Sequence, residues 1–231
     1  MRSEPILSVL GALVLVPLGL PLPLDAPATN TRTALEGQQL EAPACDEWIA
    51  DFALAARLRL ADTPFGAGNG SHDIGPGRLR LRMSKTLDPA AAKVELVAYE
   101  MHEQFVIKAA VLFMHATITT VSDTRATPDV NGVIATGMLH GREITWLTPV
   151  RGYRTDGTMQ CEGSGCGFSG VPSSGTTPLH VAPHPVQFAP FVFDPAFETL
   201  QMSESKVAQT EKPKQTAYLA LSGRRSTLQC Q

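Results

Sequence analysis

Segments in which polar and apolar residues alternate one by one are the feature of this sequence that most restricts its fold. The clearest is residues 78–83, Arg-Leu-Arg-Leu-Arg-Met. Successive side chains of a β-strand point to opposite faces, so a period of two fits a strand with one buried face. Further strand-like segments are residues 94–101, 104–121, 133–139, 143–150, 186–193 and 216–222. Residues 104–121 are too many for one ordinary strand and predict a strand pair or one bent strand.

Glycine-containing dipeptides separate several of these segments. Asn131-Gly132, His140-Gly141 and Asp156-Gly157 have the composition of hairpin turns, because glycine takes positive φ angles without steric cost. The chain has 19 glycines and 18 prolines, which agrees with many turns between short strands. The sequence therefore predicts a mainly β protein, either an antiparallel β-sandwich or a partly open β-barrel.

One helix is expected at the N-terminal side of this β structure. Residues 46–61 begin with Asp46, a candidate N-cap, and place Trp48, Ile49, Phe52 and Ala56 on one helical face. The end of the segment is ambiguous, since residues 57–60 alternate like a strand. We expect loops over residues 66–77, 161–184 and 203–215, the second of them as a recognition edge, and a short helical turn near residues 195–202.

The first 28 residues predict a signal peptide. Residues 6–24 contain no charged side chain, and three prolines among them leave only a helix of signal-peptide length. Small residues before position 29 fit a signal peptidase site, although an uncleaved anchor is the alternative. We therefore expect residues 29–45 to be an extended lead-in and residues 46–231 to form a single domain. Such a protein would be periplasmic, in the cell envelope or secreted, without a stable transmembrane helix after cleavage.

The four cysteines predict two disulfides in an exported protein, because an oxidising compartment favours pairing. Three pairings of four cysteines exist. Cys161 and Cys166 are separated by four residues that include two glycines, so this segment can turn back on itself. We favour a Cys161–Cys166 ring and a second bridge between Cys45 and Cys230, which would join the start of the domain to its end.

The cysteine ring also begins a string that resembles a zinc site. Cys161, Cys166, His180 and His184 read C-x4-C-x13-H-x3-H, close to a Cys2His2 pattern. Zinc fingers place both histidines on a helix, and four prolines after Cys166 argue against one here. We therefore expect the disulfide. The alternative keeps His180 and His184 as ligands of a metal, zinc in the first place, together with His140 or an acidic residue.

Three arginines form a second candidate site. Arg78, Arg80 and Arg82 share one face of their strand. A solvated outer face is the ordinary interpretation, and a ridge that binds phosphate or another anion is the sharper one. The whole chain carries a formal net charge of −3 and has a pI near 6.1, so it lacks the basic field that nucleic acid would require.

The remaining sequence points to binding more than to catalysis. Apolar residues are dense over 105–114 and 188–197, where most would form core and part would line a cavity for a lipid or other apolar ligand. No P-loop, H-E-x-x-H, EF-hand or G-x-S-x-G motif occurs, and the sequence predicts no cofactor.

We expect an exported, disulfide-stapled β-rich binding or structural protein. Its partner would be an apolar or amphipathic ligand or another protein of the envelope, and we do not expect an enzyme. The alternative function is a metal-assisted hydrolase, in which His180, His184 and a further ligand such as His140 or Asp156 would hold a metal-bound water.

Overall fold

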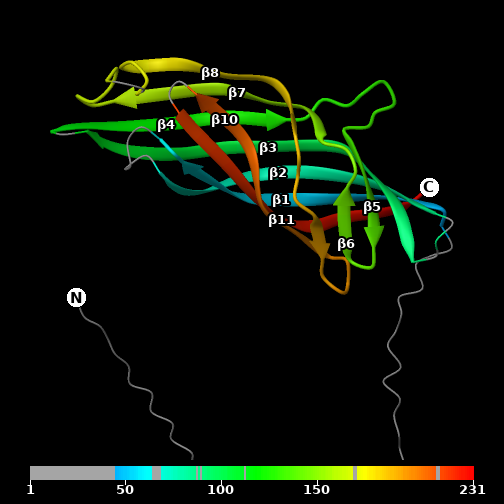
Figure 1. Ribbon diagram of the computed structural model, residues 1–231. Coiled ribbons are helices and arrows are strands. Elements are labelled where there is room, and N and C mark those ends of the chain that lie inside the picture. The colour runs from blue at the N-terminus through cyan, green and yellow to red at the C-terminus, as the bar shows by residue number, and fades with distance from the viewer. Residues whose placement is uncertain are drawn as a thin grey trace, which may run out of the picture. The chain divides into compact units, whose positions relative to one another are not determined.

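The computed structural model describes residues 45–63, 69–86, 88, 90–111, 113–168, 171–211 and 214–231. The expected signal peptide and all but the last residue of the expected lead-in lie outside these residues. Eleven strands make up most of the described chain (Figure 1). They are β1 (Glu47–Ala61), β2 (Gly70–Lys85), β3 (Ala91–Val111), β4 (Met114–Arg125), β5 (Ala135–His140), β6 (Glu143–Trp146), β7 (Val150–Glu162), β8 (Gly175–Val186), β9 (Phe191–Phe193), β10 (Thr199–Glu211) and β11 (Lys214–Cys230).

The strands pair antiparallel in one sheet, so the prediction of a mainly β, antiparallel protein is confirmed. The order is β2-β1-β11-β10-β9-β6-β5-β3-β4-β7-β8, and β2 also pairs with β3. Because of that additional pairing, eight strands form a closed ring in which each is hydrogen-bonded to the next. In order around the ring they are β2, β1, β11, β10, β9, β6, β5 and β3. β4, β7 and β8 extend from β3 as a branch of the same sheet.

Strand β3 belongs to both the ring and the branch. Its residues 92–101 pair with β2 on one side, while residues 91–96 pair with β5 and residues 100–111 with β4 on the other. The β2–β3 ladder ends at the pair Gly77–Met101, next to Pro76, which has no amide hydrogen to donate. A Cβ atom on Gly77 would lie 2.8 Å from the Glu100 carbonyl oxygen of the neighbouring strand, so a larger residue would crowd the backbone where the two strands separate. We call this place the β2–β3 fork.

The ring encloses a core of apolar and aromatic side chains. Phe188 packs against Tyr99, Tyr153 and Phe191, with ring centroids 5.6 to 6.3 Å apart. A second, smaller cluster lies in the branch and consists of Ala109, Ala116, Ile118, Cys161 and Val171. Burial of this apolar surface is the main force that holds the sheet closed.

The predicted helix over residues 46–61 was wrong, because Glu47–Ala61 is strand β1. The even-numbered residues from Ala50 to Leu60 are buried, whereas Asp51, Ala53 and their successors are partly or fully exposed. This alternation continues through the whole segment and outweighs the helical spacing of Trp48, Ile49, Phe52 and Ala56. Hydrogen-bonded partners on both sides, β2 and β11, fix it as a strand.

Several expected loops are strands as well. Residues 70–77 belong to β2, residues 203–211 to β10, and Asp156-Gly157 lies inside β7 instead of forming a turn. Residues 199–202, expected as part of a helical turn, begin β10. Residues 175–186 form β8, although they contain Pro178, Pro183 and Pro185. β8 is the last strand of the branch, and an edge strand tolerates residues without an amide hydrogen. The expectation of a strand pair over residues 104–121 is confirmed by β3 and β4.

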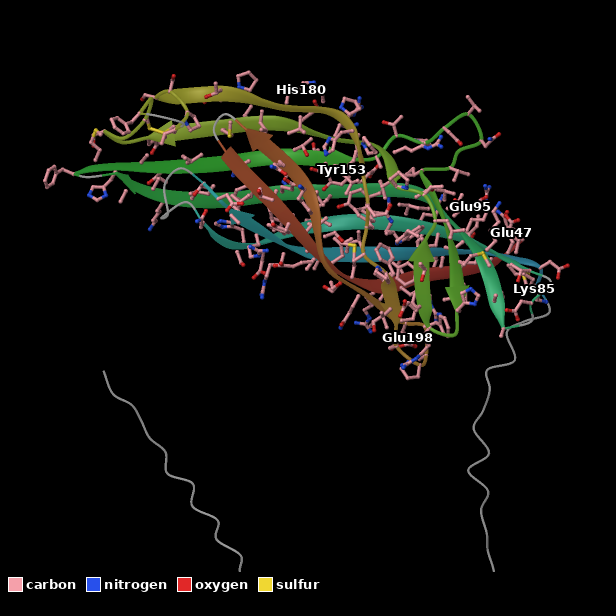
Figure 2. The ribbon with its side chains drawn as sticks, viewed as in Figure 1. Glu47, Lys85, Glu95, Tyr153, His180 and Glu198 are labelled. Carbon is pink, nitrogen blue, oxygen red and sulfur yellow. A yellow bond between two sulfur atoms is a disulfide. The ribbon has the colours of Figure 1, made fainter. Side chains whose placement is uncertain are left out.

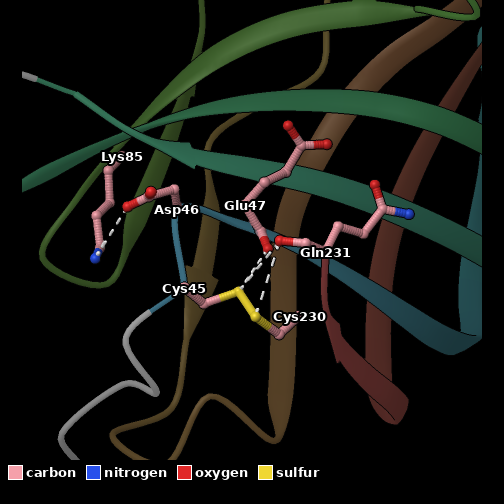
Figure 3. The surroundings of a disulfide bond; sticks show 6 residues. All are labelled: Cys45, Asp46, Glu47, Lys85, Cys230 and Gln231. Atoms are coloured by element: carbon pink, nitrogen blue, oxygen red, sulfur yellow. Dashed lines mark hydrogen bonds and ion pairs between the residues drawn. A yellow bond between two sulfur atoms is a disulfide. The ribbon is translucent and has the colours of Figure 1, made fainter.

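A disulfide joins Cys45 at the start of the described chain to Cys230 near its end (Figure 3). The two Cα atoms lie 5.8 Å apart, and the amide of Gln231 donates a hydrogen bond of 3.0 Å to the Glu47 carbonyl oxygen. The Lys85 ammonium lies 3.5 Å from the Asp46 carboxylate beside them. Both disulfides have the expected pairing, since Cys161 is bonded to Cys166. The described residues include no helix with the length and apolarity that crossing a membrane requires.

Candidate functional site

An open hollow of about 450 Å³ lies on the exposed face of the sheet at the β2–β3 fork. We call it the fork hollow. Its lining comes from β2, β3 and β4 and consists of Pro76, Gly77, Arg78, Glu100, Met101, His102, Asp123, Thr124 and Arg125. The hollow exists where the β2–β3 ladder stops, because the two strands no longer hold each other at hydrogen-bonding distance. Charged side chains from three strands therefore surround one open volume.

A second hollow of about 310 Å³ adjoins the first. Its lining is Asp51, Phe52, Ala53, Gly77, Arg78, Arg80 and Ser226. Gly77 and Arg78 belong to both hollows, so the Arg78 side chain stands between them. The two hollows together follow the exposed face from β11 and β1 to β4.

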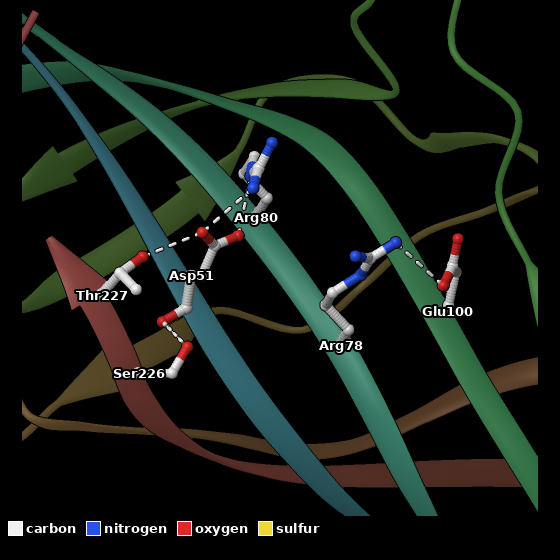
Figure 4. A network of polar contacts seen from close by, with 6 residues as sticks. All are labelled: Asp51, Arg78, Arg80, Glu100, Ser226 and Thr227. Carbon is white, nitrogen blue, oxygen red and sulfur yellow. Dashed lines mark hydrogen bonds and ion pairs between the residues drawn. The ribbon is translucent and has the colours of Figure 1, made fainter. Parts of the chain in front are cut away.

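Ion pairs organise the arginines of this surface (Figure 4). Arg80 binds Asp51 through two hydrogen bonds, with Nε–Oδ1 at 2.7 Å and Nη2–Oδ2 at 3.1 Å. Thr227 Oγ1 donates a third, of 2.9 Å, to Asp51 Oδ2. The Arg80 guanidinium is the main reason that the pKa of Asp51 is lowered. Arg78 Nη2 donates a hydrogen bond of 3.1 Å to Glu100 Oε2.

The three arginines singled out from the sequence do lie on one exposed face, but each has a carboxylate partner. Arg82 Nε donates to Glu95 Oε2 at 2.7 Å, as Arg78 and Arg80 do to Glu100 and Asp51. These pairs neutralise much of the positive charge of the ridge. Anion binding by all three stays a prediction, and only Arg78 and Arg80 reach the hollows.

Arg125, at the end of β4, is the arginine that sequence reasoning missed. Its side chain is exposed and lines the fork hollow. Within the described residues it makes no hydrogen bond and no ion pair with a side chain, so its five N–H donors face solvent. A lone arginine at the end of a strand gives no signal by itself. Its importance comes from Arg78, which lies two strands away on the same hollow.

Histidines and aspartates form a row across four neighbouring strands. His102 on β3 is opposite Asp123 on β4, Asp123 is opposite Asp156 on β7, and Asp156 is opposite His180 on β8. His102 Nδ1 lies 2.9 Å from Asp123 Oδ1, and His180 Nδ1 lies 2.6 Å from Asp156 Oδ1. Figure 2 shows the position of His180 on β8. We call these four residues the histidine–aspartate row. His102 and Asp123 also line the fork hollow.

The histidines expected to share a metal do not gather at one place. His180 belongs to the histidine–aspartate row, whereas His184 Nε2 lies 2.8 Å from the Val207 carbonyl oxygen of β10. His140 ends β5 and is opposite Glu143. In the part of the chain that the structure describes, no three His, Cys, Asp or Glu side chains form a group that could hold a metal ion. The zinc string is interrupted by the Cys161–Cys166 disulfide, because bonded sulfurs are not thiolate ligands.

A buried carboxyl group lies on the inner face of β3, one residue from the hollow. Glu103 is only 7% exposed. Thr124 Oγ1 donates to its Oε1 at 2.6 Å, and Ser122 Oγ donates to its Oε2 at 3.1 Å. Burial raises the pKa of Glu103 despite these two hydrogen bonds. Sequence analysis did not single out Glu103, because it falls between the expected strands 94–101 and 104–121, and its hydroxyl partners come from the neighbouring strand β4.

Two properties of the fork hollow limit what it can bind. It is open to solvent, and its charged groups have both signs, with Arg78 and Arg125 beside Glu100 and Asp123. Comparisons with protein-family models, curated proteins and solved structures found no match to this chain. The chemistry of these side chains therefore carries the functional assignment.

Proposed function

We propose that the protein is an exported, disulfide-stapled β-rich binding protein that holds a small anionic ligand in the fork hollow. The observation that carries this proposal is the exposed guanidinium of Arg125, which has no partner in the described chain and lies on the same hollow as Arg78. A guanidinium offers parallel N–H donors that match a carboxylate or a phosphate. An anion at Arg125 would complete the pairing that Arg78, Arg80 and Arg82 already have.

The remaining charges of the hollow select the size and character of the ligand. A volume of about 450 Å³ lies within the range of sites for small molecules. Glu100 and Asp123 would repel a second negative group placed near them and would accept hydrogen bonds from hydroxyl or amino groups. The expected ligand therefore has one anionic group and several hydrogen-bond donors, as a hydroxy acid, an amino acid or a sugar phosphate has.

A polar ligand fits the structure better than the apolar ligand expected from the sequence. The aromatic side chains inside the ring pack on one another, as the contacts of Phe188 with Tyr99, Tyr153 and Phe191 illustrate. Metal-assisted hydrolysis has no comparable support, because the described histidines do not form a ligand group.

Export is supported by the two disulfides. Disulfides persist in oxidising compartments and are rare in the cytosol. All cysteines among the described residues are paired in disulfides. A periplasmic, envelope or secreted location agrees with this chemistry. Fractionation of cells that express the full chain, followed by mass measurement of the purified protein, would test both the location and the expected removal of residues 1–28.

Isothermal titration calorimetry with inorganic phosphate and with gluconate, a hydroxy acid with one carboxylate, tests the proposed ligand class. The wild-type protein should bind at least one of the two, and Arg125→Gln should weaken that binding by about tenfold or more, since a charge-assisted hydrogen bond contributes about 1.5–3 kcal/mol. Arg142→Gln is the matched control, because Arg142 is an exposed arginine in the turn between β5 and β6. Equal affinities for wild type and both variants would overturn the proposed site.

A further inference from the structure

Two arginines are direct neighbours across the β4–β7 ladder, beside the fork hollow. Arg125 of β4 is opposite Arg154 of β7. On the other side of β4, Glu100 of β3 is opposite Arg125, and Arg78 of β2 is opposite Glu100. We call these four residues the arginine row. Directly opposite side chains of an antiparallel pair lie on one face, with Cβ atoms about 4.5–5.5 Å apart. The row therefore alternates in charge sign from β2 to β4 and then repeats a positive charge on β7.

This repeated positive charge is not balanced in the way that a neighbouring pair of like charges is. In the histidine–aspartate row, two residues away on β3, β4 and β7, Asp123 is opposite Asp156, but each aspartate has a histidine partner. Arg125 has no side-chain partner within the described residues. Like charges that face each other across a ladder destabilise a sheet, so an anion between the two arginines would relieve a repulsion built into the fold.

Arg154 is held in place by a single long contact. Its Nε atom is buried and makes no hydrogen bond in the described part of the chain. The distance from this atom to Asp156 Oδ2 is 3.6 Å, which is too long for a hydrogen bond, and Asp156 Oδ1 already lies 2.6 Å from His180 Nδ1. Little therefore opposes a turn of the Arg154 donors toward an anion at Arg125, which would supply the acceptor that they lack.

We propose that Arg125 and Arg154 together bind the phosphate group of a small phosphate monoester whose hydroxyl-bearing part occupies the fork hollow. This inference rests on the proposed function and narrows its ligand class. A phosphate monoester has a charge of about −1.5 to −2 at pH 7 and three strong acceptor oxygens, which suit two guanidinium groups. A carboxylate has one charge and two oxygens, so it satisfies one guanidinium and leaves the other without a partner.

The carboxylates beside Arg125 indicate what the rest of the ligand is. Glu100 lies opposite Arg125 on β3, and Asp123 lies two residues before it on β4, and both line the fork hollow. They accept hydrogen bonds from hydroxyl groups and repel a second phosphate. The site therefore fits the monophosphate of a sugar or another polyol and disfavours a bisphosphate.

Isothermal titration calorimetry with glycerol 3-phosphate and with glycerate tests this ligand class, because each ligand has two hydroxyl groups and they differ in the anionic group. The wild-type protein should bind glycerol 3-phosphate at least about tenfold more tightly than glycerate, since a second charged donor group is engaged. Arg154→Gln should abolish this preference by weakening glycerol 3-phosphate about tenfold, with little change for glycerate. Arg142→Gln is again the matched control and should keep the wild-type preference.

Urea denaturation without ligand separates a binding role of Arg154 from a structural one. Arg154→Gln should be at least as stable as the wild type, because it removes one of two opposed positive charges. A clearly less stable variant would assign Arg154 to a structural ion pair with Asp156 and would overturn the proposal.

Two binding results would also overturn the inference while leaving the proposed function in place. One is equal affinity of the wild type for glycerol 3-phosphate and glycerate, and the other is an unchanged preference in Arg154→Gln. The proposed function depends on Arg125, so it fails separately, when the wild type binds none of the anions or when Arg125→Gln binds them as the wild type does.

Discussion

Glu103 shows how much the surroundings of a single residue matter in this fold. Its carboxyl group is removed from water on the inner face of β3 and accepts hydrogen bonds from Ser122 and Thr124. Thr124 in turn shares a hydrogen bond of 2.6 Å with Thr155 of β7. The Glu103 carboxyl group on β3 is thereby connected to hydroxyl groups on β4 and β7. Ionisation of this one group therefore acts on hydrogen bonds that join three strands.

The raised pKa of Glu103 predicts a pH dependence of stability. The folded protein holds the proton more tightly than the unfolded chain does, so the stabilising contribution is complete below the ordinary glutamate pKa of 4.5. It is lost as the pH rises from there through the raised pKa of the folded state. Glu103→Gln, which cannot ionise, should flatten the decline in unfolding free energy that the wild type shows as the pH rises above 4.5. Urea denaturation at each pH measures this.

Glu143→Gln provides the control for that experiment, because Glu143 is exposed at the start of β6. It should follow the wild-type pH profile. A Glu103→Gln profile that declines as steeply as the wild-type profile would contradict the assignment of the pH dependence to Glu103.

For single residues, the sequence predicted the face of the strand on which a side chain lies but not the residue that it contacts. The alternation of residues 78–83 correctly placed Arg78, Arg80 and Arg82 on one face. Their partners Asp51, Glu95 and Glu100 come from β1 and β3, and pairing between strands depends on register, which alternation within one strand does not contain. Arg125 became a candidate only after the register of β4 placed it beside the fork hollow.

The core of β2 was predictable from the strict alternation of residues 78–83. The β3–β4 pair was predictable from the length of residues 104–121, which are too many for one ordinary strand. β1 was missed because Trp48, Ile49, Phe52 and Ala56 also fit a helix, and only its two strand neighbours decide between the interpretations. The three prolines of β8 suggested a loop, since nothing in the sequence says that a segment will lie at the edge of the sheet.

Close contact between β4 and β7 predicts that Gly157 cannot be replaced. A Cβ atom at this position would lie 2.2 Å from the Val121 carbonyl oxygen and 2.5 Å from Ser122 Cα. Gly157→Ala should therefore destabilise the protein by about 2–3 kcal/mol, because the backbone of β4 has to move. Chemical denaturation of the variant measures the loss.

Gly70→Ala is the matched control for this contact. A Cβ atom on Gly70 would have only the tip of His72 within reach, at 3.9 Å. Gly70 is the first residue of β2, and Gly157 lies inside β7. The difference in unfolding free energy between Gly70→Ala and Gly157→Ala therefore reports mainly the crowding at Gly157. Equal stability of both variants would show that β4 and β7 are less tightly packed than the structure has them.

The whole described domain is held by a covalent link between its two ends. The Cys45–Cys230 disulfide spans 185 residues and the Cys161–Cys166 disulfide only 5. Because closing a long loop removes more entropy from the unfolded chain, the first bridge should stabilise by about 5 kcal/mol and the second by about 2 kcal/mol.

Paired serine substitutions separate these contributions. The Cys45→Ser, Cys230→Ser protein should have a clearly lower melting temperature than the Cys161→Ser, Cys166→Ser protein, with each compared to the wild type by calorimetry under oxidising conditions. A larger fall in melting temperature for the Cys161→Ser, Cys166→Ser protein would contradict the entropic explanation. It would indicate that the hydrogen bond from Gly165 to the His115 carbonyl oxygen contributes more to stability.

Strand β3 belongs to both the closed ring and the branch, and the two arginines of the fork hollow come from the strands on either side of it, Arg78 from β2 and Arg125 from β4. A ligand held by both arginines would therefore be a non-covalent cross-link between the ring and the branch, at the point where the backbone hydrogen bonds between β2 and β3 stop.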